Sequence, residues 1–435
     1  MEVHQMHKIA FLVLLLCSLL FCMASCKNAD HEHVLDEWKQ ISESSCSKQG
    51  EMIRNCTKKN CDYTETKYLD LKSHDYEDSV TPPTKTTDGY TTHTCKNCAH
   101  VLVDTYVPAV GSDNLEYDHI VTDESVTCII TGIGTCKDTD VYIPTYIGKY
   151  PVVAIAEGAF KKCDTIRSVT LPKGIVEIGK EAFYECSNLE KITIPDTVQK
   201  VDANAFFSCY KIRYVYISNL TAWCKIKFRT ADANPTNFAT KLFLNNQLLT
   251  SLTIPDEVTE IGDFAFVNCS SITEIFIPEG VTYIGVDTFS NCGITSITIP
   301  DSVEKILSRA FEKCKYLTNI KLPSGLTEIK AYVFANCWRL QNIEIPQTVT
   351  RIDLGAFENC SGLVSITIPK SVKSIGARAF RDCTNLGSIV LEDTNNWLAY
   401  DDSYDITGTP IDVTDPVKNA TYFKTARDFA HWEKN

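Results

Sequence analysis

A Phe-x-x-Cys motif recurs along most of this chain at an almost constant interval. Seven of the eight steps between its copies are 22 or 23 residues, and the exception, from Cys209 to Cys269, is more than twice as long. The cysteines of the motif are Cys163, Cys186, Cys209, Cys269, Cys292, Cys314, Cys337, Cys360 and Cys383. A fixed period of this length is typical of repeat proteins, in which each unit packs only on its neighbours.

Most units continue with a short alternating apolar segment that ends at a proline. In the clearest copy, Ile192 and Ile194 flank Thr193 and Pro195 follows. Alternating β-branched residues predict a strand, and proline ends it because it has no N–H for the ladder. One such strand cannot bury its own apolar face. We therefore expect the copies to stack their strands into a parallel sheet and form a solenoid.

The repeat resembles the BspA-type class of leucine-rich repeats, found on surface proteins of bacteria and some protozoa. The resemblance covers residues 120–430, about three quarters of the chain. It implies a repeat solenoid with short parallel β-strands, one in each coil of about 23 residues. We expect an N-terminal capping coil over 113–158, repeats over 159–395 and a C-terminal cap over 396–435. An insert at 218–248 would enlarge one coil while keeping the sheet continuous.

Residues 1–25 have the features of a lipoprotein-type signal peptide. Lys8 precedes the apolar run 9–21, and small residues then lead to Cys26. Met23-Ala24-Ser25-Cys26 resembles a bacterial lipobox, with Met where Leu is usual, and this implies a diacylglycerol on Cys26. Acyl chains bury methylenes in the bilayer and so hold a protein at its surface. We predict an exported, membrane-anchored lipoprotein at a bacterial cell surface; the alternative is a secreted protein.

Residues 26–112 form a cysteine-rich stalk with two short modules. The same offset in sequence separates Gly50 from Gly89 and Cys56 from Cys95. Each module ends in a close cysteine pair after an upstream histidine (His33 or His74), and the pairs are Cys56 with Cys61 and Cys95 with Cys98. Two such pairs can hold zinc in a tetrahedral thiolate site. A disulfide in each small module and free thiols are the alternatives, and no other cofactor is expected.

The nine cysteines of the repeat are expected to be reduced, buried and structural. Equivalent positions on stacked strands lie about 4.8 Å apart with parallel side-chain directions. A disulfide requires its Cβ atoms to approach to about 3.8 Å with a nearly perpendicular torsion. Stacked cysteines are therefore close together but wrongly aimed for bridging.

Neither an enzyme nor a nucleic-acid partner is expected. Residues 120–430 contain no histidine, which excludes Ser-His and Cys-His catalysis from the repeat. The chain has 42 Lys and Arg against 55 Asp and Glu, a net charge of -13, and so would repel phosphate. These observations favour a non-catalytic binding protein.

The outward positions of the predicted strands are mostly Ser and Thr, with three aromatic exceptions. These are Tyr214, Tyr216 and Phe276, and Trp223 lies nearby in the insert. Grouped exposed aromatics are typical interface anchors, so we predict that the four residues bind an extracellular protein or glycan ligand. The insert could instead cover the rings. The resemblance implies adhesion to host or neighbouring-cell macromolecules; a surface lipoprotein that captures carbohydrate is the alternative.

Overall fold

The computed structural model describes residues 32–239, 241–400, 408–425 and 431–434. The signal segment and Cys26 therefore lie outside the described residues. The chain forms two compact units, Met1–Pro82 with Gly89–Val107, and Pro83–Asp88 with Pro108–Asn435. Within the described ranges, no helix has the length and apolarity that crossing a membrane requires.

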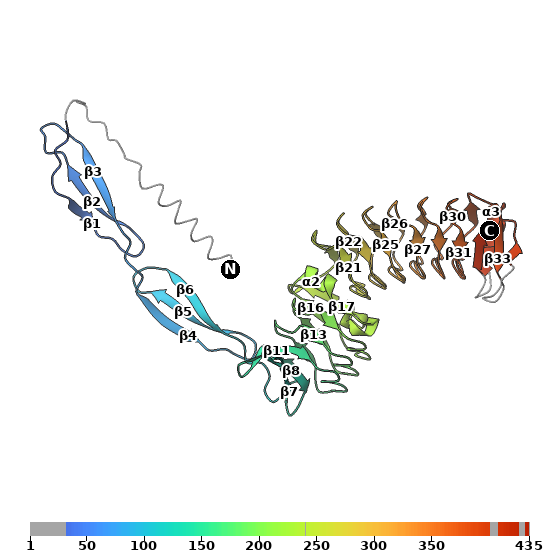
Figure 1. Cartoon of the computed structure of the whole chain (residues 1–435), viewed down its shortest axis with the longest axis horizontal. Coiled ribbons are helices and arrows are strands. Elements are labelled where there is room, and N and C mark those ends of the chain that lie inside the picture. Colours follow the sequence, from blue (N-terminus) through green and yellow to red (C-terminus); the bar gives the residue numbers. More distant parts are fainter. Residues whose placement is uncertain (1–31, 240, 401–407, 426–430, 435) are drawn as a thin grey trace. The chain divides into compact units, whose positions relative to one another are not determined.

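The first unit contains two modules, each an antiparallel three-stranded sheet (Figure 1). The strands are β1 (Lys39–Ser42), β2 (Gly50–Asn55) and β3 (Thr64–Leu69) in one module, and β4 (Tyr76–Thr81), β5 (Gly89–Cys95) and β6 (Val101–Val107) in the other. Gly50 and Gly89 begin the central strands. A Cβ at Gly50 would lie 2.5 Å from the Ser44 backbone nitrogen, so only glycine fits there.

The second unit starts with a hairpin that leads into the repeats. Its elements are β7 (Glu116–Val121), β8 (Val126–Gly132), β9 (Asp140–Tyr142), β10 (Tyr146–Ile147) and β11 (Tyr150–Ile155). β8 pairs in parallel with β11, and β11 with β13 (Glu177–Ile178), so this region begins the stack of parallel strands.

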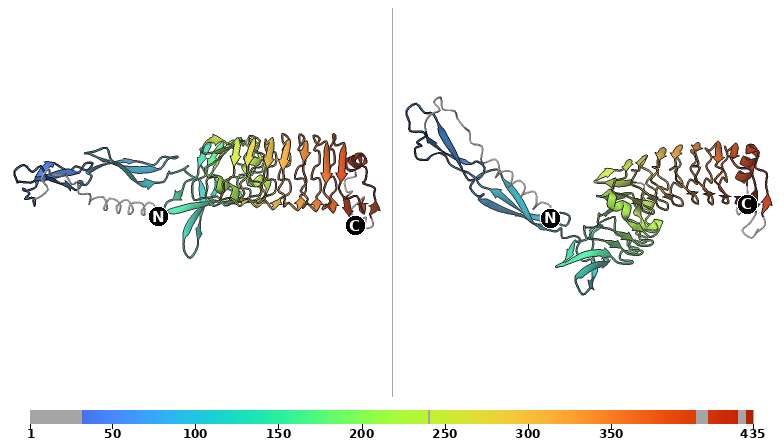
Figure 2. Two further views of the ribbon diagram at one scale, coloured as in Figure 1. Left: turned by 90° about the horizontal axis from the view of Figure 1, so that it is seen from above. Right: turned by 45° about the horizontal axis from the view of Figure 1, so that its top comes forward.

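The predicted strands form a column of parallel rungs, which Figure 2 shows side by side. Where neighbouring strands of the column pair, they do so without a register shift, as in Ile192 opposite Val215. The column comprises β12 (Ser168–Thr170), β14 (Lys191–Ile194), β16 (Tyr214–Ile217), β18 (Lys241–Leu244), β20 (Ser251–Thr253), β22 (Glu274–Phe276), β24 (Ser296–Thr298), β26 (Asn319–Lys321), β28 (Asn342–Ile343), β30 (Ser365–Ile368) and β32 (Ser388–Leu391). The repeat solenoid predicted from the sequence is confirmed.

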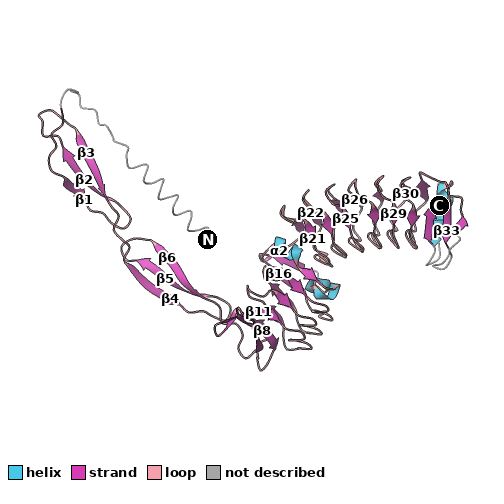
Figure 3. Cartoon of the chain, viewed as in Figure 1, coloured by secondary structure: helices cyan, strands magenta, loops and turns pink. Residues whose placement is uncertain are grey.

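A second column of two-residue strands follows the proline turns (Figure 3). The sequence does not predict this column, because two residues are too few to show a period. Its strands are β13 (Glu177–Ile178), β15 (Lys200–Val201), β17 (Lys227–Phe228), β21 (Glu260–Ile261), β23 (Tyr283–Ile284), β25 (Lys305–Ile306), β27 (Glu328–Ile329), β29 (Arg351–Ile352) and β31 (Ser374–Ile375). The final residue of each of these strands is apolar and packs in the core.

Stacked phenylalanines fill the core between the columns. Phe311 and Phe334, for example, are fully buried, with nearly parallel rings whose centroids are 6.0 Å apart. The residue before the motif cysteine has a positive φ in these coils, as at Asn336 (φ 63°) and Asn359 (φ 62°). Asparagine tolerates this left-handed conformation better than most residues, which explains its frequency there.

The insert adds a rung but interrupts the sheet. It contains α2 (Leu220–Lys225), β17, η1 (Ala231–Ala233), η2 (Pro235–Asn237), β18 and β19 (Gln247–Leu248). β18 continues the sheet of β16, but β19 then folds back antiparallel on β18 and occupies its outer edge. β20 begins a separate sheet, so the expectation that the insert keeps the sheet continuous is wrong.

The C-terminal region covers the last coils of the stack. It contains β33 (Trp397–Tyr400), β34 (Thr409–Pro410), α3 (Pro416–Thr425) and β35 (His431–Lys434), and β35 pairs antiparallel with β31. The Phe423 ring meets Phe380 edge-on at 6.2 Å, so it ends the row of stacked rings. β32 is the last strand of the column, so no further strand in the described ranges pairs with its outer edge. The buried Asn419 amide donates to the Ile389 carbonyl on β32 at 3.1 Å.

Candidate functional site

The two predicted tyrosines lie on β16 and pack against an aromatic ring from the insert. Tyr214 and Tyr216 are half-buried. The Phe243 ring on β18 stacks on Tyr216 at 4.8 Å and meets Tyr214 edge-on at 6.1 Å. The Lys191 ammonium lies 4.7 Å from the Tyr216 ring centroid. Phe243 was not predicted, although the short apolar run Leu242-Phe243-Leu244 is consistent with a strand within the insert.

Trp223 is in the core and not on the surface. Its side chain is 1% exposed, and its Nε1 donates to the Ala265 carbonyl at 2.8 Å. Leu220, Trp223 and Cys224 form the buried face of α2. The predicted contact of Trp223 with a ligand is therefore wrong, because its ring fills the core at the interrupted part of the sheet.

Phe276 is the most exposed of the predicted aromatic residues. It lies on β22, in a different sheet from Tyr214 and Tyr216, so the four predicted residues do not form a single patch. Its side chain is 61% exposed and lines a groove of about 810 Å³. Residues from β22, β24 and β26 line this groove, among them Glu274, Thr298 and Lys321. An apolar ring, both signs of charge and a hydroxyl are thus available on one open surface.

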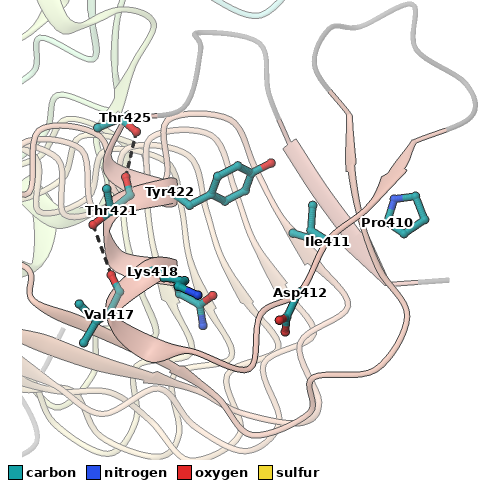
Figure 4. A pocket seen from close by; sticks show the side chains of 9 residues that line it. Pro410, Ile411, Asp412, Val417, Lys418, Thr421, Tyr422 and Thr425 are labelled. Atoms are coloured by element: carbon teal, nitrogen blue, oxygen red, sulfur yellow. Dashed lines mark hydrogen bonds between the residues drawn. The ribbon is translucent and has the colours of Figure 1, made fainter.

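A further cavity of about 670 Å³ lies beside α3 (Figure 4). Ile411 and Tyr422 form part of its lining. Two of its polar groups are already engaged, because Asp412 accepts from the Thr414 hydroxyl at 2.6 Å and Thr425 donates to the Thr421 carbonyl at 2.9 Å. The described lining offers mainly apolar surface.

Most cysteines of the repeat have the same structural partner in the preceding coil. Seven thiols donate to the carbonyl of the motif phenylalanine in the preceding coil, at 2.9–3.3 Å; they are Cys186, Cys209, Cys292, Cys314, Cys337, Cys360 and Cys383. Burial raises the pKa of the Cys314 thiol to about 12. Such thiols are poor nucleophiles and ligands. Cys163 differs from the prediction, because it is only half-buried and contacts the Thr165 hydroxyl at 3.3 Å.

The stalk cysteines form two separate clusters with histidines. The ligand atoms in each cluster lie within 4.8 Å of one another, and the clusters are Cys46, His74, Cys95 and Cys98, and His33, Cys56 and Cys61. The four predicted thiols are therefore not in one site. Each cysteine pair lies beside the histidine of its own module. Cys46 belongs to the first module but lies in the cluster of the second module, and it was not predicted as a ligand.

Neighbouring groups shift the pKa values of two thiols in the four-residue cluster in opposite directions. The Cys98 thiol, together with burial, raises the pKa of Cys46 to about 11. Burial also acts to raise the pKa of Cys95, but hydrogen bonds from the Asn97 backbone and the His74 ring outweigh it and lower that pKa to about 6. The polar environment around Cys95 thus favours a thiolate.

Comparison with known proteins identifies similar repeats. The family model for the BspA type leucine rich repeat region matches residues 139–233, 236–364 and 282–402. No curated protein matches the chain. A solved leucine-rich repeat protein from Bacteroides ovatus is similar, with a TM-score of 0.50 and 27% identity, over 64% of this chain and 70% of that one.

Two further solved structures share the repeats but superpose less closely. A leucine rich cell surface protein from Faecalibacterium prausnitzii is 27% identical over 67% of this chain and 96% of that chain, with a TM-score of 0.35. A leucine rich repeat protein of T. pallidum is 24% identical over 52% and 88% of the respective chains, with a TM-score of 0.32.

Proposed function

Because the chain belongs to the family of proteins with BspA-type leucine-rich repeats, we propose that it is a non-catalytic adhesion protein of a bacterial cell surface. Its solenoid binds macromolecules of a host or a neighbouring cell. The observation that carries this proposal is the groove beside Phe276, where a large apolar ring is 61% exposed. Such a ring gains free energy when a partner removes it from water.

Phe276 is the proposed anchor, because the surrounding outward positions offer little apolar area. Ser296 and Thr298 occupy the next strand, while Glu274 and Lys321 can pair with charges on a ligand. Interfaces commonly depend on one central aromatic residue surrounded by weaker polar contacts. Tyr214 and Tyr216 are proposed as a secondary contact surface, since their rings already pack on Phe243.

Carbohydrate capture is the second candidate, and the composition of the same groove favours it. A sugar presents an apolar ring face and several hydroxyls. The Phe276 ring can cover that face, while Glu274, Thr298 and Asn319 can bond to hydroxyls. The proposed ligand is accordingly an extracellular protein or a glycan.

The test compares binding of wild type and variants to a glycan array and to a panel of extracellular matrix proteins. Phe276→Ala is expected to weaken capture of the identified ligand at least about tenfold, which corresponds to about 1.4 kcal/mol. Val390→Ala is the matched control, because Val390 occupies the equivalent outward position on β32. The site would lie on β16 instead if Phe276→Ala bound the ligand as wild type does and the double variant Tyr214→Ala/Tyr216→Ala did not bind it.

Membrane anchoring through Cys26 is proposed as part of the same function. Cys26→Ser is expected to move the protein from the membrane fraction to the medium, because a diacyl anchor would be lost. Retention of the variant in the membrane fraction, as assessed by immunoblotting, would contradict lipidation at this residue.

A further inference from the structure

We propose that Cys46, His74, Cys95 and Cys98 bind one zinc ion, which ties the two modules of the first unit together. This proposal is independent of the ligand that the solenoid binds. Three thiolates and one imidazole are a common donor set for structural zinc, and four protein ligands would close the coordination sphere. Such a site stabilises a fold and leaves no open position for catalysis.

The four ligand atoms lie within 4.8 Å of one another, and two of the distances between them match the edges of a zinc tetrahedron. The Cys46 and Cys95 sulfurs are 3.7 Å apart. Two sulfurs at about 2.3 Å from a tetrahedral zinc would be separated by about 3.8 Å. The Cys98 sulfur lies 3.4 Å from His74 Nδ1, and a sulfur and a nitrogen at zinc distances would be separated by about 3.5 Å. A disulfide would need its sulfurs at about 2.0 Å.

The ligands come from separate segments that zinc would hold together. Cys95 ends β5 and Cys98 follows in the next turn, whereas His74 precedes β4. Cys46 comes from the loop between β1 and β2 of the other module. The described part of this unit buries only three apolar side chains, Cys46, Cys56 and Cys95. A unit with so small a core needs another source of stability, and metal ions commonly supply it.

Further contacts hold the ligands in position. The His74 ring stacks on His100 with 4.3 Å between centroids. The Tyr76 hydroxyl and His100 Nδ1 are 2.9 Å apart, and the Cys95 backbone N–H donates to the His100 carbonyl at 3.0 Å. Groups that orient metal ligands in this way typically raise metal affinity by about 10–100-fold.

The loop that carries Cys46 does not depend on the metal for its shape. The equivalent loop of the next module has the same hydrogen bond: Ser45 N–H to Lys48 O is 2.8 Å, and Thr84 N–H to Thr87 O is 2.9 Å. That second loop carries Lys85 in place of Cys46 and belongs to the second unit. A substitution at position 46 should therefore remove a ligand without unfolding the loop.

The test uses the full chain, purified reduced and metal-free, and titrated with zinc against a competing chelator. Wild type is expected to bind one equivalent of zinc at this site, and Cys46→Ser is expected to bind it at least about a hundred-fold more weakly. Cobalt titration should show tetrahedral bands for the wild type, with less thiolate-to-metal charge transfer in Cys46→Ser. The matched controls are Cys61→Ser, which changes the other cluster, and Cys163→Ser, which lies outside both clusters. Both should bind this zinc ion as tightly as wild type does.

Two results would overturn the proposal. One is equal zinc affinity and stoichiometry in wild type and Cys46→Ser. The other is a disulfide from Cys46 to Cys95 in the non-reduced native protein, detected by mass spectrometry. If Cys46→Ser were misfolded, His74→Cys provides a second measurement, since it keeps four ligands and should retain the metal while changing the cobalt spectrum.

Discussion

Cysteines in the solenoid lie one behind another along successive coils, whereas those of the first unit converge with histidines at two points. In the solenoid, Cys337 donates to the Phe311 carbonyl of the preceding coil at 3.2 Å. In the first unit, Cys46 and Cys95 bring their sulfurs to 3.7 Å from different modules. The two units thus give the same residue type opposite surroundings, one apolar and repetitive, the other polar and convergent.

The difference follows from how each unit brings its residues together. A parallel stack translates every residue by one rung, so equivalent thiols point the same way and each meets a backbone carbonyl. Antiparallel hairpins instead return the chain, and their turns gather residues from several segments at one end. Repetition therefore produces a packed core, while convergence produces a candidate metal site.

Thiol reactivity should show the largest difference between the two units. In the reduced, metal-free chain, Cys98 is half-buried and should be alkylated readily, whereas Cys337 is fully buried. Labelling of Cys337 requires the solenoid to open, and a stability of at least about 5 kcal/mol would slow it a thousand-fold or more. Timed alkylation with mass spectrometry measures both rates. Comparable rates would contradict the burial of the solenoid thiols.

Removing one ring from the stack should destabilise only the solenoid. Phe311 is fully buried between Phe289 and Phe334, and Phe311→Ala should cost about 3–5 kcal/mol. The exposed Val364→Ala is the control and should change stability by less than about 0.5 kcal/mol. Urea unfolding followed by circular dichroism measures both. A small effect of Phe311→Ala would mean that the stack tolerates gaps.

The smallest effect on stability is expected for Lys85, which occupies in the second module the position that Cys46 has in the first. Lys85 pairs with Asp138 at 2.7 Å, and Lys85→Ala should cost about 0.2–1 kcal/mol, since both side chains are partly exposed. Hydrogen bonds from Lys85 and Ser112 lower the pKa of the Asp138 carboxyl. The contribution of this ion pair to the free energy of unfolding is therefore present above the ordinary carboxyl pKa of 3.8, and it is lost as pH falls through the lowered pKa of Asp138.

A matched pair of denaturation series measures this pH dependence. Wild type and Lys85→Ala should differ at pH 7 and converge in acid, once Asp138 is protonated. Adding salt at pH 7 should also reduce the difference, because exposed charges are screened. A difference that persists in acid would indicate lost packing of the lysine stem instead of a lost ion pair.

The amino-acid sequence was enough to specify the solenoid and the strands that follow the Phe-x-x-Cys motifs, but not the second column of strands. The reason is that a period of 22 or 23 residues forces every coil to place the same side chain at the same point in the core. Pro195 and its equivalents marked where most of these strands end, because proline lacks the N–H that a ladder requires. The shared offset of the stalk glycines and cysteines likewise indicated two modules with equivalent cysteine pairs.

Contacts between segments that do not repeat became visible only in the folded chain. The insert has no period, so neither the burial of Trp223 nor the stacking of Phe243 on Tyr216 follows from spacing. The partnership of Cys46 with the second cluster depends on how one module packs on the next. A repeat period specifies contacts between equivalent residues, whereas contacts between unlike segments depend on the path that the chain takes in space.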